Sequence, residues 1–319
     1  DLPWWSFQNF SGIRLLLFPL YLLWTLACTC WYFIFFARNR IDVVNPQSRD
    51  DFISATLAAK ILRKKVIWSD HADLKYIYAN HRVWYKNPVG KLAFFMSRYA
   101  SAVVIESRSE KHLIEASLGG HAPNNHVVIY IGVVDTYKET KKQDSSDVVF
   151  VSTSRLVADK GIGDLVSAMN MINAKNARLK ICGDGPDADS FKKLAKGNNK
   201  IEFLGHISNI EKVLAGADVL IHPTYREGFG LSLVEAEMFK LPIIASNVDS
   251  IPEIVKDGVS GILVEPRNPQ DLADAIDRLA SSKDLREKMG EAGRKIFLEN
   301  FQFDVIVKEK IIPLYNKGK

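Results

Sequence analysis

The sequence has only three cysteines in 319 residues, Cys28, Cys30 and Cys182. Three thiols make no disulfide framework, so the chain does not read as a disulfide-rich secreted domain, and a reducing, cytoplasmic compartment is favoured. No internal repeat of solenoid period is present, which excludes repeat architectures. Asp70 and Asp73 flank His71, but no further ligand follows at a convincing spacing. We therefore expect no metal site and no cofactor.

Net charge is also small, and it is unevenly distributed. Residues 1–145 contain 18 Lys and Arg against 12 Asp and Glu, a net charge of +6, whereas residues 146–319 contain 24 against 25, a net charge of −1. The two values sum to the +5 of the whole chain. The basic half is the one expected to meet an anionic surface or acceptor.

One long apolar stretch is present, from Leu15 to Phe36, where 22 residues carry no charge. As a helix it would extend about 33 Å, enough to cross a bilayer. Aromatic residues such as Trp24 and Trp31 are typical of membrane interfaces. The stretch is a membrane span, a helix lying in the interface, or a core helix. The strand-like segment at residues 41–44 favours the last two, since a span would cut the first sheet away from anything upstream.

After residue 40, strand-like and helix-like segments alternate in both halves of the chain. This pattern predicts an α/β protein with two Rossmann-like, doubly wound parallel sheets. The polar run from Lys138 to Ser146 is the best linker. We expect an N-terminal domain over residues 1–143, with an apolar helix at about 11–38, and a C-terminal domain over 144–300. Ligands of such sheets bind outside the carboxyl ends of the strands, here a cleft between the domains.

The most informative segment runs from Arg226 to Ala236. It follows the apolar run 217–223, which reads as a buried parallel strand closing on a proline. Gly228 and Gly230 allow a tight loop whose amides approach a ligand closely, and the loop leads into a helix N-terminus suited to phosphate. Glu227 and Glu235 flank the loop and suit sugar hydroxyls. Alternatively, they are helix-start acids that complement the dipole.

Three further motifs lie at predicted strand ends. Arg155 and Lys160 follow a strand and converge on one diphosphate, unless they are solvated surface cations. The segment from Cys182 to Pro186 is a nucleotide contact or a tight turn, since one GxG is weak evidence of a site. His71 hydrogen-bonds a reacting sugar or is a structural imidazole.

The C-terminal half closely resembles the retaining GT-B glycosyltransferases of family 4, and the N-terminal half resembles them more loosely. Seven segments match in family order: Ser154-Arg155-Leu156 with Lys160-Gly161, Cys182-Gly183-Asp184-Gly185-Pro186, Phe203-Leu204-Gly205-His206, Glu227-Gly228-Phe229-Gly230 with Glu235-Ala236, residues 242–246, residues 251–255, and Asp257-Gly258 with Gly261. An E-x7-E spacing alone is weak, but the ordered set is specific. The resemblance implies a metal-independent enzyme that moves a sugar from a nucleotide-diphospho-sugar to a glycan or lipid-linked acceptor.

The resemblance also implies roles for single residues. Arg155 and Lys160 would hold the diphosphate and stabilise the departing nucleotide. Glu235 would accept from the ribose hydroxyls, Glu227 would contact the donor sugar, and His71 would approach that sugar from the first domain. The other donor-binding positions would be Gly183, Gly185, Gly205, Gly228, Phe229, Gly230 and Leu231. Residues 301–319 would form a helix that crosses back to the first domain.

Three departures from the family pattern are evident. Ile131 stands where the hinge usually has Asn, and Asp249-Ser250 replaces a common Gly-Gly. No counterpart of the family's first strand and acceptor loop precedes residue 1, so we expect a fragment with an incomplete N-terminal domain. Two alternatives are a nucleotide-sugar epimerase on the same fold and a nucleotide-sugar-binding protein without turnover. The basic first half and the apolar helix lead us to expect peripheral contact with the inner membrane face.

Overall fold

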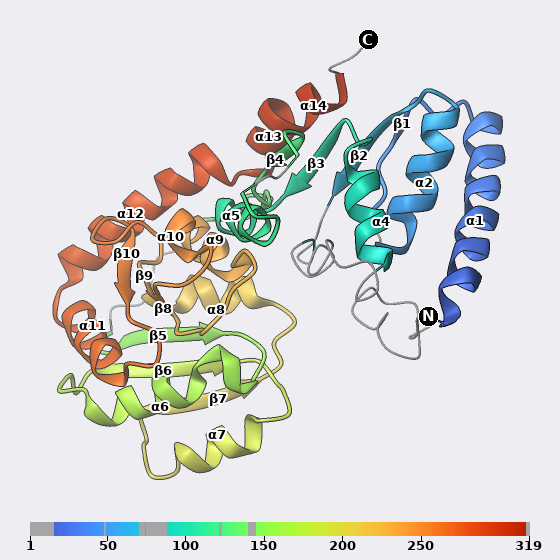
Figure 1. The fold of residues 1–319 in the computed structure, drawn as a ribbon. Coiled ribbons are helices and arrows are strands. Elements are labelled where there is room, and N and C mark those ends of the chain that lie inside the picture. Colours follow the sequence, from blue (N-terminus) through green and yellow to red (C-terminus); the bar gives the residue numbers. More distant parts are fainter. Residues whose placement is uncertain are drawn as a thin grey trace. The chain divides into compact units, whose positions relative to one another are not determined.

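The computed structural model describes residues 16–47, 49–69, 74, 88–120, 123–139 and 145–316. The chain divides into two compact units, residues 1–130 with 310–319, and residues 131–309. Each unit contains one parallel β-sheet with helices packed against it (Figure 1). The α/β fold with two parallel sheets is therefore confirmed.

The first unit contains a four-stranded sheet whose strands follow one another in chain order, β1-β2-β3-β4. All three strand pairings are parallel. The described strands thus run across the sheet in one direction, without the reversal that marks a doubly wound sheet. Its elements are α1 (Phe18–Arg38), β1 (Val43–Val44), α2 (Arg49–Ile61), β2 (Lys65–Ser69), α4 (Pro88–Ser97), β3 (Ala102–Ile105), α5 (Arg108–Ser117) and β4 (His126–Val128).

The core of the first unit is built around Trp68 on β2, which is fully buried. Its ring stacks on Phe52 of α2, with the ring centroids 4.4 Å apart. Its indole N–H donates to the hydroxyl of Thr56 at 2.8 Å, so the one polar atom of this large side chain is satisfied. The last helix of the chain, α14 (Ile312–Asn316), joins this unit, because the Lys65 ammonium donates to the Leu314 carbonyl at 2.6 Å.

The second unit contains a six-stranded sheet in the order β10-β9-β8-β5-β6-β7. All its pairings are parallel. Numbered within the unit, this is the strand order 6-5-4-1-2-3 of dinucleotide-binding folds, and its direction reverses between β5 and β8. The strands are β5 (Val148–Thr153), β6 (Ala177–Cys182), β7 (Ile201–Gly205), β8 (Val219–His222), β9 (Ile243–Ser246) and β10 (Gly261–Val264).

The helices of the second unit follow the strands that the sequence predicted. They are η3 (Ala158–Lys160), α6 (Ile162–Met171), α7 (Ala188–Leu194), α8 (Ile210–Gly216), α9 (Leu231–Met238), α10 (Ile251–Ile254), α11 (Pro269–Ser281), α12 (Lys283–Asn300) and α13 (Phe303–Ile306), with the π-helical turn η4 (Val307–Ile311) leading to α14. Buried residues of β5, β6 and β8 pack with those of α6 and α11 into one hydrophobic core. The sequence also predicts a strand over residues 127–131, which is shorter in the structure, and a mostly helical stretch over residues 76–99. Helix α4 forms the described part of that stretch, and residues 76–87 lie outside the described residues.

The chain enters the second unit along α12. Val133 forms a parallel bridge with Gln302, and the Asp135 carboxylate accepts two hydrogen bonds from the Arg294 guanidinium, at 2.9 and 2.7 Å. These bonds to Arg294 hold the pKa of Asp135 below its usual value, although partial burial opposes them. This bidentate pair fixes the start of the unit against the helix that also supports α9.

Glu237 is a fully buried carboxyl group on α9. Helix α12 approaches it closely, since a Cβ at Gly293 would lie 3.2 Å from Glu237 Cγ. Among the described residues, neither carboxyl oxygen has a hydrogen-bond partner of good geometry. Burial raises the pKa of Glu237 to about 9, against opposing contributions from Ser260 and Lys256. The folded protein therefore holds this group as a neutral acid near pH 7.

A raised pKa in the folded state means that the folded chain binds more protons than the unfolded chain between pH 4.5 and about 9. Stability conferred by the neutral acid is complete below pH 4.5 and is lost as pH rises through this window. Glu237→Gln should remove this loss and stabilise the protein by about 1–3 kcal/mol at pH 8, with no gain at pH 4.5. Thermal melts across this range measure the effect, with the exposed Glu202→Gln as control. Parallel melting curves for wild type and Glu237→Gln would contradict the assignment.

Candidate functional site

The site lies where the direction of the second sheet reverses, at the carboxyl ends of β5 and β8. The loop after β5 carries Arg155 and Lys160, and the loop after β8 carries Glu227. Open parallel sheets bind their ligands at such a reversal, because the loops from the two neighbouring strands leave in opposite directions and open a crevice. The topology therefore places the motifs predicted from the sequence at the binding edge of this sheet.

The two loops approach each other more closely than any side chain at position 161 allows. Gly161 has a φ of 66°, and a Cβ there would lie 1.9 Å from the Pro223 carbonyl oxygen. Beside it, the Asp159 carbonyl accepts from the Tyr225 amide at 2.8 Å and from the Thr224 hydroxyl at 3.2 Å. This backbone contact brings Lys160 next to Glu227.

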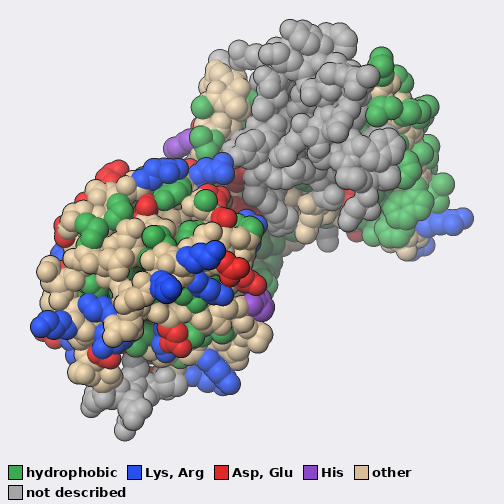
Figure 2. Space-filling model, turned by 90° about the horizontal axis from the view of Figure 1, so that it is seen from below, with side chains coloured by type: hydrophobic (Ala, Val, Ile, Leu, Met, Phe, Trp, Pro, Cys, Tyr) green, Lys and Arg blue, Asp and Glu red, His purple; other side chains and the backbone are tan. Residues whose placement is uncertain are grey.

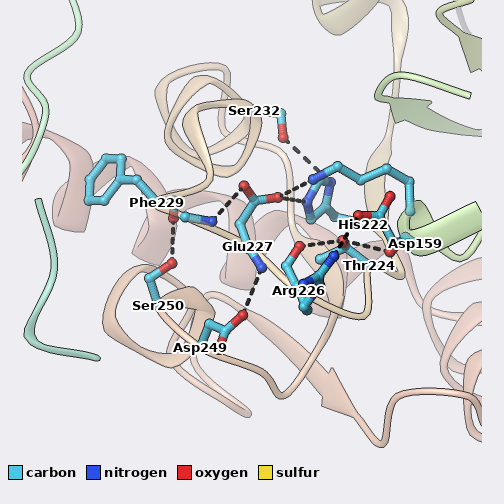
Figure 3. A network of polar contacts seen from close by, with 11 residues as sticks. Asp159, His222, Thr224, Arg226, Glu227, Phe229, Ser232, Asp249 and Ser250 are labelled. Carbon is cyan, nitrogen blue, oxygen red and sulfur yellow. Dashed lines mark hydrogen bonds and ion pairs between the residues drawn. The ribbon is translucent and has the colours of Figure 1, made fainter. Parts of the chain in front are cut away.

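The Glu227 carboxylate is the centre of a hydrogen-bond network (Figure 3). Its Oε2 atom contacts the Lys160 ammonium at 2.9 Å and His222 Nε2 at 2.7 Å. Its Oε1 atom accepts from the Gly228 amide at 3.1 Å. The side chains of Lys160 and Glu227 are each 15% exposed, so the ion pair is largely removed from water without being sealed off from a ligand.

The charge state of Glu227 follows from these partners. Burial opposes ionisation, but the hydrogen bonds and charges of His222 and Lys160 outweigh it and lower the pKa of Glu227 to about 2. The group is a carboxylate at every physiological pH. The Ser232 hydroxyl lies 3.5 Å from His222 Nδ1, and the donor and acceptor roles in this contact depend on the protonation of the imidazole.

The loop between β9 and α10 supports the Glu227 loop from the other side. The Asp249 carboxylate accepts from the Glu227 amide at 2.9 Å, and the buried Ser250 hydroxyl donates to the Phe229 carbonyl at 2.9 Å. Asp249 holds a φ of 47°, a conformation that Gly adopts freely and that Asp and Asn tolerate best among other residues. The departure from Gly-Gly at these positions thus provides two hydrogen bonds to the site loop.

A cavity of about 270 Å³ lies at the carboxyl ends of β5, β6 and β7, and neither Lys160 nor Glu227 lines it. Arg155, which is exposed and forms no ion pair within the described part of the chain, lines it. Gly183 also lines it, but the reason for glycine there is packing, because a Cβ would lie 1.9 Å from the Ser154 carbonyl. Gly185 is tight for the same reason, at 2.4 Å from the Leu156 carbonyl. The cavity is lined by Thr153, Ser154, Arg155, Cys182, Gly183, Asp184, His206, Ile207 and Ile210.

The other predicted positions fall into three groups. Gly205 and Gly228 have open space where a side chain would begin, whereas Gly230 caps α9 with a φ of 102°. Leu231 begins α9 and is exposed, but the Phe229 ring is buried against Phe301, 6.1 Å between centroids, so the ring is not available to a ligand. His71 lies outside the described residues.

Glu235 lies on α9 and is not part of the Lys160–Glu227 pair. Burial and the nearby charge of Glu211 raise the pKa of Glu235, and among the described residues no hydrogen bond to its carboxyl group is recorded. Glu235 is not among the residues that line the cavity. A carboxyl group destabilised in this way gains from a ligand that donates hydrogen bonds to it.

His222 is a functional candidate that the sequence patterns do not single out. It is only 3% exposed and ends β8, inside the apolar run 217–223 that the sequence predicts as a buried strand. Its position at a strand end, five residues before Glu227, was the available signal. The position of Lys160 relative to both residues is set by a loop contact that spacing does not reveal.

The arrangement combines features that bind anions with features that bind hydroxyl groups. The ammonium of Lys160, the free guanidinium of Arg155 and the N-terminus of α9 all attract negative charge. The ionised Glu227 accepts hydrogen bonds only. Within the described residues there is no group of three or more His, Cys, Asp or Glu side chains able to hold a metal ion.

The Asp249 bond predicts a difference between two conservative substitutions. Asp249→Asn keeps an acceptor for the Glu227 amide and tolerates the left-handed backbone, so it should change the free energy of unfolding by less than about 0.5 kcal/mol. Asp249→Ala removes the hydrogen-bond acceptor and places a residue less suited to the left-handed backbone there, so it should lower the free energy of unfolding by about 1–2 kcal/mol. Urea unfolding of both variants measures the difference. Equal losses would show that the side chain does not support the loop.

Comparison with known proteins gives one family for the second unit. The family model described as glycosyl transferases group 1 matches residues 133–296. An uncharacterised glycosyltransferase of Methanocaldococcus jannaschii is 33% identical over 176 residues, which is 53% of this chain and 45% of that protein. The N-acetyl-alpha-D-glucosaminyl L-malate synthase of Bacillus anthracis is 30% identical over 51% of this chain and 44% of its own length. The chain thus spans less than half the length of these two relatives.

Solved structures share the fold over most of the chain. The Anabaena protein HepE in complex with UDP superposes with a TM-score of 0.75 at 21% identity, covering 93% of this chain and 82% of that one. A glycosyltransferase from Rickettsia africae gives a TM-score of 0.77 at 22% identity, covering 92% of this chain and 82% of that chain. At these identities the similarity establishes the fold alone.

Proposed function

Because this chain belongs to the glycosyl transferases group 1 family, we propose that it transfers a sugar from a nucleotide-diphospho-sugar to an acceptor hydroxyl. The observation that carries the proposal is the Lys160–Glu227–His222 cluster at the reversal of the second sheet. The cluster presents one cation, Lys160, and one ionised carboxylate, Glu227, at the edge where such sheets bind nucleotides. In a donor that contains a diphosphate and a sugar, the diphosphate suits the cation and the sugar hydroxyls suit the carboxylate.

In this proposal the two cations act on the diphosphate. Lys160 and Arg155 bind its oxygens, and the charge that develops on the departing nucleotide is stabilised where it forms. Glu227 accepts hydrogen bonds from the donor sugar, and the α9 amides that begin at Leu231 contribute at the phosphate. Glu235 accepts from the ribose hydroxyls. His222 keeps the Glu227 carboxylate in place through its Nε2 hydrogen bond.

We propose that the reaction retains the anomeric configuration and uses no metal. The bond between the anomeric carbon and the phosphate oxygen breaks, the acceptor oxygen attacks from the same face, and its proton passes to the departing phosphate. No protein nucleophile takes part in this route, because the oxocarbenium-like transition state forms beside the diphosphate that stabilises it. The two cations supply the charge neutralisation that a metal ion supplies elsewhere.

We propose a glycan or lipid-linked acceptor and a cytoplasmic location, with peripheral contact at the inner face of the membrane. Support for the reducing compartment is the absence of a disulfide among Cys28, Cys30 and Cys182, all of which are free. Support for the membrane contact is the net charge of +6 on the first 145 residues. The HepE complex contains UDP, and we propose a uridine nucleotide as the first donor to test.

The base of the donor is open to a direct screen. UDP-, GDP- and ADP-sugars should be compared by thermal shift, because a ligand that binds only the folded state raises its stability by RT ln(1 + [L]/Kd). One nucleotide series should raise the melting temperature, and the shift should disappear in Lys160→Met. A shift that persists unchanged in Lys160→Met would place the nucleotide elsewhere, and no shift with any donor would contradict a donor site.

The roles of the charged groups predict separate kinetic effects. Lys160→Met should lower kcat by roughly 30-fold or more, about 2 kcal/mol, because it removes charge stabilisation of the leaving group. Glu235→Gln should raise the donor KM with a smaller change in kcat, since the ribose contact exists before and during the reaction. Lys192→Met, on the exposed surface of α7, is the matched control. Wild-type kinetics in the two site variants would refute the roles assigned to them.

A separate experiment distinguishes a transferase from an epimerase. Incubation of the enzyme with a nucleotide sugar but no acceptor would yield an epimer of the sugar only if the enzyme were an epimerase.

A further inference from the structure

Helix α1 in the first unit has an inverted distribution of polar and apolar side chains. The buried stripe contains Tyr21, Thr25, Thr29 and Phe36. The threonine hydroxyls donate to backbone carbonyls of α1 itself, Thr25 to Tyr21 at 2.8 Å and Thr29 to Thr25 at 2.7 Å. The side that packs on the unit is therefore the more polar one.

The opposite side of α1 is exposed and consists of large apolar side chains. Trp24 and Trp31 are 53% and 59% exposed. The other large exposed side chains on or next to this helix are Leu16, Leu20, Leu22, Leu23, Leu26, Phe33, Ile34 and Phe35. Figure 2 shows hydrophobic side chains gathered at the end of the first unit where α1 lies, on the right of both views. An apolar surface of this extent is rare on soluble proteins and marks an interaction site.

Basic side chains lie at the C-terminal end of this face. Arg38 ends α1 and Arg40 follows two residues later, and both are exposed. Lys64 forms an ion pair with Asp42 at 3.4 Å, which brings the Arg63-Lys64 turn to the same end of the helix. The apolar face and this basic end together form what we call the α1 surface. Apolar residues with tryptophan beside a cluster of cations match the acyl chains and anionic headgroups of a membrane.

We infer that the α1 surface binds an anionic lipid bilayer, with α1 lying in the interface. A protein partner fits less well, because specific protein interfaces carry about one hydrogen bond per 100–200 Å². Between residues 16 and 37, the exposed side chains of α1 offer only the indole N–H groups of the two tryptophans and the weakly polar thiol of Cys30. A bilayer interior requires no hydrogen bonds from the surface that enters it.

The packing of α1 decides between lying in the membrane and crossing it. By length and composition α1 is able to span a bilayer. However, it packs on α2, and the Tyr32 hydroxyl donates to the Asp51 carboxylate of that helix at 2.6 Å. A spanning α1 would draw α2, with the ionisable side chains of Asp51 and Lys60, into the hydrocarbon, which is strongly unfavourable. With α1 in the interface, α2 stays on the water side. This inference rests on the membrane contact proposed above and assigns it to α1, but it uses the first unit alone and does not depend on the donor site.

Vesicle sedimentation tests the inference on the full chain. Wild-type protein should bind phosphatidylcholine vesicles containing phosphatidylglycerol, and bind pure phosphatidylcholine vesicles less. Trp24→Gln with Trp31→Gln should lower the partition coefficient at least tenfold, because both rings are on the exposed side and leave the core unchanged. Arg38→Gln with Arg40→Gln should weaken binding at low salt and have little effect at high salt. Leu194→Gln with Met171→Gln, which alters exposed apolar residues of the second unit, is the matched control.

Three results would overturn the inference. Equal binding by wild type and the double tryptophan variant would place the lipid contact elsewhere. A wild type that ignores vesicles but forms dimers, with the tryptophan variant monomeric in sedimentation velocity, would assign the face to a second copy. Quenching of tryptophan fluorescence by lipids brominated near the bilayer centre, together with resistance to alkaline extraction, would show a spanning helix. Quenching only by lipids brominated near the headgroups supports the interfacial position.

Discussion

The close approach of two backbone loops at position 161 is the constraint on which the site depends. Glycine there leaves space for the Pro223 carbonyl, and the Asp159 carbonyl then ties the loop after β5 to the loop after β8. A Cβ at position 161 would lie 1.9 Å from the Pro223 carbonyl oxygen, so any side chain there would force the two loops apart. Lys160 and Glu227 come from strands that are neighbours only because the sheet reverses between β5 and β8. The strand order and Gly161 are therefore both required to bring Lys160 and Glu227 together.

The electrostatics of the site follow from that geometry. The Glu227 side chain is only 15% exposed, yet the pKa of Glu227 falls because a cation and an imidazole both contact one of its oxygens. Glu237, only ten residues further along, is buried without such partners and stays protonated near neutral pH. The contrast shows that burial alone does not determine the charge of a carboxyl group in this unit. The partners determine it.

Much of the fold was predictable because it is recorded in local patterns. The sequence patterns predict strands over residues 148–152 and 219–221 and a helix over residues 269–279, and the bounds of β5, β8 and α11 agree with these within a few residues. The sequence predicts that Lys160 and Glu227 lie at the same edge of the sheet. It does not predict that they form an ion pair, because that contact joins residues 67 apart in the chain. The role of His222 was not predicted, because a single histidine at the end of an apolar strand does not show which side chain it contacts. Gly183 and Gly185 were read as ligand contacts, and the structure gives a packing reason for both glycines.

The central claim is that the Lys160–Glu227–His222 cluster holds the diphosphate and sugar of a nucleotide donor. Its most direct test is a crystal structure of the chain with a nucleoside diphosphate bound. We expect the phosphate oxygens within hydrogen-bond distance of the Lys160 ammonium and the Arg155 guanidinium, at the carboxyl ends of β5 and β8. A nucleotide bound elsewhere on the second unit, with Lys160 and Arg155 making no contact with phosphate, would contradict the claim.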